Sequence, residues 1–139
     1  MNRQAAKGAR LQEPDAELDA WAQAVVQAAI EVHHQLGPGF LESVYQEALC
    51  VELSLRGVPH PQQVPIEVEY KGRRVGQARL DLLVAGRLVV ELKAVDSLLP
   101  IHVAQVISYL KTTRQKLGLL INFKVSFQQR GLRRVILTQ

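Results

Sequence analysis

The spacing of the apolar residues changes near Pro59 and Pro61, and this change limits the class of fold that the chain can adopt. Before the two prolines, apolar residues recur at steps of three and four over residues 15–36 and 41–56, which is typical of amphipathic helices. After them, residues 64–70 alternate between apolar and polar, which is typical of a half-buried strand. The chain therefore begins with helices and continues as a sheet, which indicates an α/β protein.

Turn signals divide the rest of the chain. Lys71–Gly72 and Ala85–Gly86–Arg87 separate three strands, which we expect to pair as an antiparallel meander. A helix beginning at Pro100 and two further strands follow. The predicted architecture is a mixed β-sheet flanked by helices, with its strands at residues 64–70, 74–84, 88–94, 117–123 and 132–137 and its third helix at residues 100–113.

The length of 139 residues and a hydrophobic fraction of 47% are those of one globular domain. We expect residues 1–14 to form a flexible N-terminal tail and residues 15–139 to form a single domain. No apolar run approaches the ~20 residues that span a membrane, and no signal peptide follows the basic N-terminus, so we expect a cytoplasmic protein. The single Cys50 and the scattered histidines do not have the spacing of a zinc site.

The positive charge lies in the C-terminal part of the chain. Residues 1–14 hold three bases and one acid, residues 15–56 one base and seven acids, and residues 57–139 thirteen bases and five acids, which sum to +2, −6 and +8. Such an excess suits a phosphate-rich partner, and an ordinary solvated surface is the alternative. The bases gather in three clusters, Arg73/Arg74/Arg79, Lys111/Arg114/Lys116 and Arg130/Arg133/Arg134.

The predicted strand 88–94 carries an acid and a base among apolar residues. Glu91 and Lys93 are two residues apart, so their side chains lie on the same face of the strand. Asp81 is similarly isolated among leucines on the preceding strand. A half-buried carboxylate without a partner costs several kcal/mol or becomes protonated, so a partner is expected.

The register of this hairpin decides whether Asp81 faces Glu91. A three-residue loop at 85–87 sets the two residues opposite each other, with their Cβ atoms about 5 Å apart. A two-residue loop would oppose Asp81 to Val90 and turn Glu91 to the other face. The pattern of apolar residues favours the three-residue loop.

Two facing carboxylates repel each other unless a cation lies between them, and Mg²⁺ or Mn²⁺ with oxygen ligands is the usual solution. Lys93 would lie beside the ion, where a lysine can orient or deprotonate an attacking water and offset charge that develops on a phosphate. The structural alternative is a cross-strand ion pair, either Asp81 with Lys93 or Glu91 with Arg79.

Asp81 on one strand, Glu91–Leu92–Lys93 on the next and a following helix with Gln105 and Tyr109 resemble the PD-(D/E)XK nuclease superfamily, whose site is an Asp and a Glu-x-Lys on adjacent strands. Leu80 stands where the superfamily's name has a proline, a change that the family tolerates.

A second motif lies upstream. Gly39–Phe40–Leu41–Glu42–Ser43–Val44–Tyr45 resembles the Gly-x-x-Glu-x-x-Tyr signature of a bacterial group within the superfamily, the GxxExxY proteins. Together the two resemblances cover about residues 20–137.

The resemblance implies a restriction-endonuclease-like core with a metal-dependent phosphodiesterase site. Asp81 and Glu91 would be ligands of Mg²⁺ or Mn²⁺, and Lys93 the catalytic base or electrostatic stabiliser. Glu42, on a core helix, would join the metal ligands directly or through water. Gln105 would orient water or a backbone phosphate.

Two tyrosines have open roles. Tyr45 follows Glu42 by one helical turn, and Tyr109 shares a helix face with Gln105, so both could point toward the site. Each could equally be a core aromatic whose hydroxyl is satisfied by hydrogen bonds.

We therefore interpret the chain as a Mg²⁺- or Mn²⁺-dependent nuclease that acts on nucleic acid, with DNA as the expected substrate and a homodimer as one way to grip it. Arg133 and Arg134 of the last strand are expected to contact phosphates. Two alternatives remain: a catalytically inactive nuclease-fold domain that binds nucleic acid or a protein partner, and an enzyme that hydrolyses a smaller phosphodiester.

Overall fold

The computed structural model describes residues 14–138, apart from the side chains of residues 128 and 129, and it confirms the predicted order of helices and strands. Their ends lie within two residues of the predicted ends, and η1 is an addition that the apolar pattern does not predict. The predicted tail, residues 1–14, lies outside the described part except for Pro14. The elements are α2 (Ala16–Leu36), α3 (Glu42–Leu55), β1 (Gln62–Tyr70), β2 (Arg73–Val84), β3 (Leu88–Lys93), α4 (Pro100–Thr113), β4 (Leu117–Asn122), the short helical turn η1 (Phe127–Gly131) and β5 (Leu132–Ile136).

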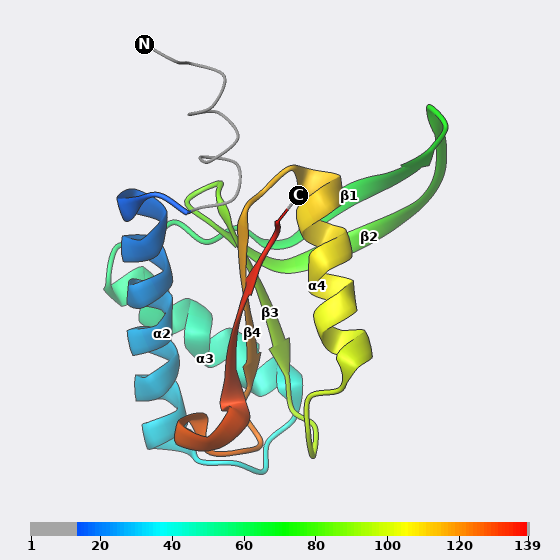
Figure 1. The fold of residues 1–139 in the computed structure, drawn as a ribbon. Coiled ribbons are helices and arrows are strands. Elements are labelled where there is room, and N and C mark those ends of the chain that lie inside the picture. The colour runs from blue at the N-terminus through cyan, green and yellow to red at the C-terminus, as the bar shows by residue number, and fades with distance from the viewer. Residues whose placement is uncertain (1–13, 139) are drawn as a thin grey trace.

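The five strands form one mixed sheet in the order β1-β2-β3-β4-β5 (Figure 1). The first three pair antiparallel, as the meander predicts. β4 runs parallel to β3 after the crossover through α4, and β5 returns antiparallel to β4. A parallel pair needs a crossover connection, and its strands are usually covered on both faces. β3 and β4 are accordingly the most buried strands of the sheet.

Helices cover both faces of the sheet (Figure 1). Val90 and Leu119 belong to the core under α2 and α3, whereas Leu120 packs with Val106 of α4 on the opposite face. Because strand side chains alternate, Glu91 lies on the α4 face. Within residues 14–138, no helix combines the length and the hydropathy needed to cross a membrane.

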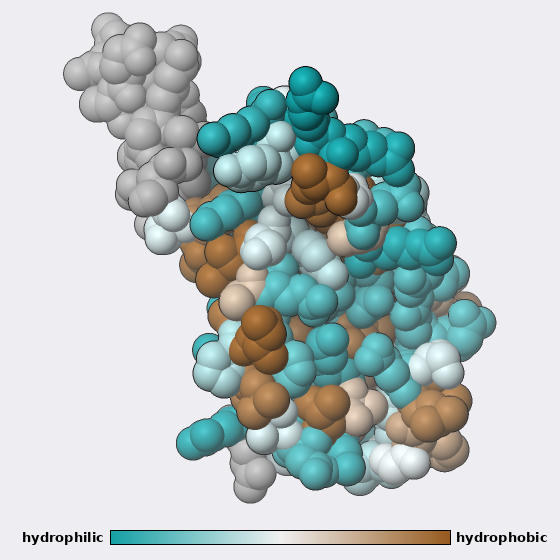
Figure 2. Space-filling model, turned by 90° about the vertical axis from the view of Figure 1, so that its right-hand side faces the viewer, coloured by the Kyte–Doolittle hydropathy of each residue, from teal (hydrophilic) through white to brown (hydrophobic). Residues whose placement is uncertain are grey.

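The outer half of the β1–β2 hairpin projects from the body of the molecule (Figure 1), which corrects the prediction of a half-buried strand over its whole length. Val64 and Ile66 pack against the core on the α4 side. Val68 is 36% exposed and Tyr70 63% exposed, because the hairpin extends past α4 toward its tip. The face seen in Figure 2, over α4 and the hairpin, is mainly hydrophilic with separate apolar side chains.

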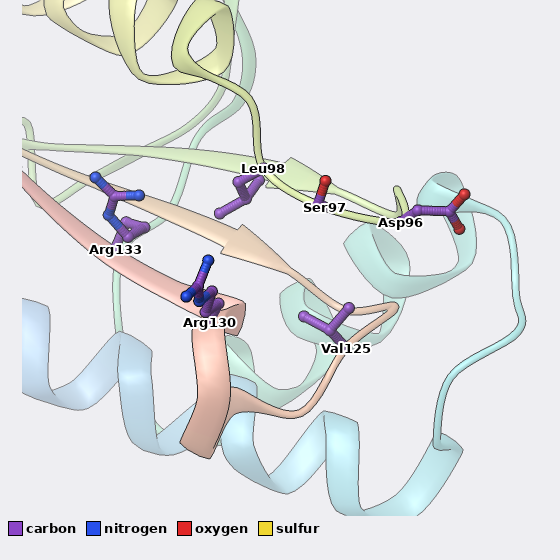
Figure 3. A pocket seen from close by; sticks show the side chains of 6 residues that line it. All are labelled: Asp96, Ser97, Leu98, Val125, Arg130 and Arg133. Atoms are coloured by element: carbon purple, nitrogen blue, oxygen red, sulfur yellow. The ribbon is translucent and has the colours of Figure 1, made fainter.

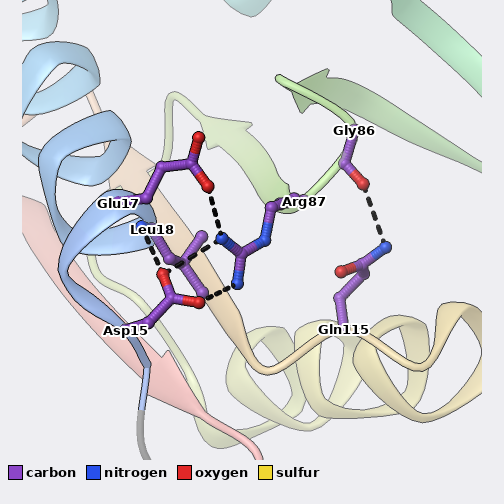
Figure 4. A network of polar contacts seen from close by, with 6 residues as sticks. All are labelled: Asp15, Glu17, Leu18, Gly86, Arg87 and Gln115. Atoms are coloured by element: carbon purple, nitrogen blue, oxygen red, sulfur yellow. Dashed lines mark hydrogen bonds and ion pairs between the residues drawn. The ribbon is translucent and has the colours of Figure 1, made fainter.

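The turn between β2 and β3 is held from two sides (Figure 4). Arg87 donates to both carboxylate oxygens of Asp15, at 3.0 and 2.7 Å. Asp15 also caps α2 by accepting a hydrogen bond from the Leu18 N–H at 2.8 Å. The hydrogen bonds from Arg87 and Leu18 lower the pKa of Asp15 to about 2. On the other side, Gln115 Nε2 donates to the carbonyl oxygen of Gly86 at 3.1 Å.

Candidate active site

The three-residue turn 85–87 sets the register between β2, which carries Asp81, and β3, which carries Glu91. Its Gly86 adopts φ = 69°, in the left-handed region that glycine tolerates without strain. The turn pairs Leu82 with Val90, so the next opposed position outward brings Asp81 to Glu91. This confirms the three-residue register and excludes the two-residue loop.

The side chains of Asp81 and Glu91 each accept a hydrogen bond from the opposite backbone. Glu91 Oε2 accepts from the Asp81 N–H and Asp81 Oδ2 from the Leu92 N–H, both at 2.8 Å. These bonds lie where the β2–β3 pairing ends, so carboxylate oxygens replace the carbonyl acceptors of a regular ladder. Glu91 is only 4% exposed, and both side chains are fixed in place.

Burial and the charge of Asp81 raise the pKa of two glutamates at this point. Burial, followed by the charge of Asp81 and a smaller contribution from Glu42, raises the pKa of Glu91 to about 8, although the Asp81 N–H and Lys93 act in the opposite direction. Burial and then Asp81 also raise the pKa of Glu42, while Lys93 lowers it. Glu42, Asp81, Glu91 and Lys93 therefore form one electrostatic cluster drawn from α3, β2 and β3.

Lys93 ends β3 and is half-buried. Neither of the alternative cross-strand pairs, Asp81 with Lys93 or Glu91 with Arg79, is among the ion pairs within 4 Å that residues 14–138 form. The ammonium group of Lys93 thus acts on the carboxylates through charge without a direct contact.

α4 brings two of the predicted residues toward the same cluster. Burial and then the charges of Glu91 and Asp81 raise the pKa of Tyr109, and a hydrogen bond with Gln105 acts against them. Gln105 and Tyr109 are therefore partners on the helix that covers the face bearing Glu91.

The Gly-x-x-Glu-x-x-Tyr segment builds the turn that begins α3. Gly37 and Gly39 have positive φ values of 67° and 115°. The buried Tyr45 hydroxyl donates to the Gly37 carbonyl oxygen at 2.5 Å and accepts from the Phe40 N–H at 3.2 Å. The Tyr45 hydroxyl therefore makes the hydrogen bonds expected of its structural role, and it holds the turn that sets Glu42 at the first position of α3.

Arg133 and Arg134 have different surroundings. As neighbours in β5 they point to opposite faces of the sheet. Arg134 pairs with Leu119, and its guanidinium forms an ion pair with Asp19 of α2 at 2.9 Å. Arg133 pairs with Leu120 and lies on the α4 face, which also bears Glu91.

The chemistry of the site suits a hard divalent cation at two of the three predicted ligands. Asp81 and Glu91 supply oxygen donors, and the second oxygen of each makes no hydrogen bond to a described residue. Burial and the charge of Asp81 disfavour the charged form of Glu91, and a bound cation relieves that cost. No group of three His, Cys, Asp or Glu side chains that could hold a metal ion is found within residues 14–138, and Glu42 is coupled to Asp81 and Glu91 by charge.

Asn122 is a supporting residue that the sequence reasoning missed. It is fully buried at the end of β4, beside Lys93 in the parallel register. Its Oδ1 accepts from the Val95 N–H at 3.0 Å, and its Nδ2 donates to the Val95 carbonyl oxygen at 2.8 Å. This pair of bonds fixes the segment that leaves β3 directly after Lys93. The available signal was a polar residue inside the apolar run 117–123.

Comparison with known proteins identifies the family of this chain. No curated protein matches the chain significantly. One solved structure, described as the crystal structure of SSO0001, aligns with a TM-score of 0.46 and 16% identity, covering 83% of this chain and 66% of that chain. The sequence model of the PD-(D/E)XK nuclease superfamily matches residues 19–135, a span that includes Asp81, Glu91 and Lys93. The chain therefore belongs to the PD-(D/E)XK nuclease superfamily.

Proposed function

We propose that this chain is a Mg²⁺- or Mn²⁺-dependent nuclease that hydrolyses phosphodiester bonds of nucleic acid, with DNA as its substrate. The observation that carries the proposal is the facing pair Asp81 and Glu91, with Lys93 at the end of the same strand. A structural sheet has no need of two opposed acids, one of them 4% exposed with a pKa of about 8. Strongly perturbed groups of this kind gather at functional sites.

Each residue of the cluster has a role in this proposal. Asp81 and Glu91 hold the ion through the oxygens that their backbone hydrogen bonds leave available. Glu42 approaches it through water. Lys93 orients the attacking water and offsets the negative charge that develops on the phosphate oxygens. Gln105 holds a water or phosphate oxygen from α4, with Tyr109 as its hydrogen-bond partner.

Hydrolysis joins the oxygen of water to phosphorus and breaks the bond to the leaving sugar oxygen, which takes up a proton. A divalent ion supplies Lewis acidity at such a site, toward both water and a phosphoryl oxygen. The protein supplies the fixed positions of the carboxylates, because their hydrogen bonds to the backbone prevent them from turning away.

We also propose that the chain belongs to the GxxExxY group. The support is the segment Gly39–Tyr45, in which the glycine has a φ of 115° and the tyrosine hydroxyl holds the turn before Glu42. Each named position of the motif thus contributes to holding this glutamate near Asp81.

The test is incubation of the protein with labelled single-stranded, duplex and branched DNA and RNA in Mg²⁺, Mn²⁺ or EDTA. We expect cleavage of DNA in either metal and none in EDTA. Glu91→Gln and Lys93→Ala should each lower the cleavage rate by at least about a hundredfold, the scale of a lost electrostatic or acid–base contact.

Glu69→Gln is the matched control, because Glu69 is an exposed glutamate of β1 outside the cluster. Its cleavage rate should equal that of the wild type. Wild-type protein that binds nucleic acid but cleaves none of these substrates would leave the inactive binding domain as the function.

A further inference from the structure

A cavity of about 420 Å³ lies between the segment that leads from β3 to α4 and the segment that leads from β4 to β5 (Figure 3). One wall is the segment that follows β3, with Asp96, Ser97 and Leu98, and the other is formed by Val125, Arg130 and Arg133. Asp81, Glu91 and Lys93 do not line it. The cavity is therefore separate from the candidate active site, and no step of the proposed hydrolysis uses its lining residues.

The cavity carries positive charge that the described residues leave unbalanced. Neither Arg130 nor Arg133 forms an ion pair with a residue of 14–138. Asp96 is the one acid among the lining residues, and its carboxylate binds Lys124 at 2.5 Å. Figure 3 shows that this carboxylate points away from both guanidinium groups and that the Arg130 guanidinium points toward Leu98.

Four of the seven other arginines within residues 14–138 are paired, whereas Arg73, Arg79 and Arg114 are not. Arg56, Arg74, Arg87 and Arg134 each form an ion pair with an acid of the chain. Two guanidinium groups that line one hollow repel each other, and an anion bound there removes that cost. The planar fork of arginine matches the oxygens of a phosphate.

The sheet register relates this cavity to the acidic pair. Glu91 pairs with Leu120, and Leu120 pairs with Arg133, so the three residues form one row across the sheet. Directly paired residues point to the same face, and two strand spacings separate Glu91 from Arg133 by roughly 10 Å. The cavity wall at Asp96–Leu98 begins three residues after Lys93.

The start of α4 adds to the positive field. A second hollow, of about 380 Å³, shares Leu98 and Arg133 with the first and is also lined by Leu99 and Pro100, where α4 begins. The first turn of this 14-residue helix contains no acidic residue. The positive end of the helix dipole therefore acts on the same region without an acid of that turn to oppose it.

We propose that Arg130 and Arg133 bind a phosphate of the nucleic-acid strand whose neighbouring phosphodiester lies at Asp81 and Glu91. This inference rests on the proposed function and assigns the contact that sets the strand's position along the sheet. The ligand is a phosphate oxyanion, which is either an internal phosphodiester or the terminal phosphate of a strand.

The experiment measures binding of fluorescein-labelled oligonucleotides by anisotropy, in EDTA and in Ca²⁺. The probes are single-stranded and duplex DNA and RNA of the same sequence, each made with a 5′-phosphate, with a 3′-phosphate or with neither. The variants are Arg130→Ala/Arg133→Ala and the matched control Arg134→Ala, which removes the neighbouring arginine that faces α2.

We expect the double variant to bind about tenfold more weakly, because a contact to one phosphate is lost on every sequence. For single strands, the slope of log affinity against log salt should become less steep by about 0.7 per phosphate no longer neutralised. Arg134→Ala should bind like the wild type. An equal loss of affinity for the 5′-phosphorylated, 3′-phosphorylated and unphosphorylated probes identifies an internal phosphate. A loss of affinity confined to one of the phosphorylated probes identifies a terminal phosphate.

Wild-type affinity in the double variant, an equal loss in Arg134→Ala, or no binding of any probe by the wild type would overturn the inference. The outcome is separable from that of the nuclease proposal, because binding is measured apart from cleavage. Arginine-dependent binding without cleavage in Mg²⁺ or Mn²⁺ would keep the phosphate site and remove the nuclease activity. Cleavage that persists with wild-type binding in the double variant would do the reverse.

Discussion

Replacing Glu91 by glutamine should stabilise the protein, and by more as the pH rises. The pKa of Glu91 lies at about 8 against an ordinary value of 4.5, because burial and Asp81 disfavour its charged form. The folded chain therefore holds a proton that the unfolded chain releases between these two values, so wild-type stability falls as the pH rises through this window. Below pH 4.5 the group is neutral in both states and the stability that it contributes is fully present.

The size of the effect follows from the same shift. A displacement of this size corresponds to at most about 5 kcal/mol, since one pKa unit is about 1.4 kcal/mol. Glutamine is neutral at every pH, and its Oε1 can still accept the hydrogen bond that the Asp81 N–H now donates to Glu91. The variant should therefore match the wild type near pH 4.5 and exceed it by a few kcal/mol at pH 9.

Urea denaturation of both proteins at pH 5, 7 and 9 in EDTA measures this difference directly. Contributions of the other titrating groups largely cancel because both proteins carry them. Glu69→Gln is the control, because Glu69 is an exposed glutamate outside the cluster, and the change with pH should be larger for Glu91→Gln than for this control. A flat difference for Glu91→Gln, or a wild type that gains on the variant as the pH rises, would refute the assignment of a costly buried charge to this position.

Three further predictions concern the metal, the turn before α3 and the packing of the sheet. Mg²⁺ at pH 8 should raise the melting temperature of the wild type but not of Glu91→Gln, because ligand binding to the folded state stabilises it and this variant removes a ligand; thermal unfolding measures both. Tyr45→Phe should cost about 1–2 kcal/mol in urea unfolding, because the hydroxyl's two hydrogen bonds to the turn are lost. Gly118→Ala should cost about 1–3 kcal/mol, because a Cβ there would lie 2.7 Å from Cγ1 of the stiff Val106, whereas Gly76→Ala, with nothing within 4 Å, is the control.

The register of the β2–β3 hairpin, which carries Asp81 and Glu91, could be predicted because it depends on the residues of one turn and its two strands. A three-residue turn containing a glycine and the alternation of apolar residues on both sides leave one arrangement in which the leucines stay buried. The same alternation misled at Val68 and Tyr70, because a pattern of period two reports which face a side chain takes and not whether anything covers that face.

Contacts between residues far apart in the sequence could not be predicted from local patterns. The alternation of side chains along a strand predicts that Arg133 and Arg134 point to opposite faces of the sheet. Only the β4–β5 register shows which of them shares a face with Glu91. The contact between Asp15 and Arg87 joins residues 72 apart in the sequence, and neither residue has a local signal for the other. The loss of the β2–β3 ladder at Asp81 is likewise a property of the whole sheet, because β2 there continues with β1 alone.

The projecting hairpin has a consequence for how the protein avoids aggregation. β1 is an edge strand, and unpaired backbone groups at an edge invite another chain to add a strand. Pro65 has no N–H to offer there, Gln63 departs from extended geometry with a φ of 49°, and the register shift at Val68/Glu69 twists the edge away from a partner. The edge is thus interrupted at three points along its length, so a long exposed arm can extend from the sheet without serving as a template for continued strand addition.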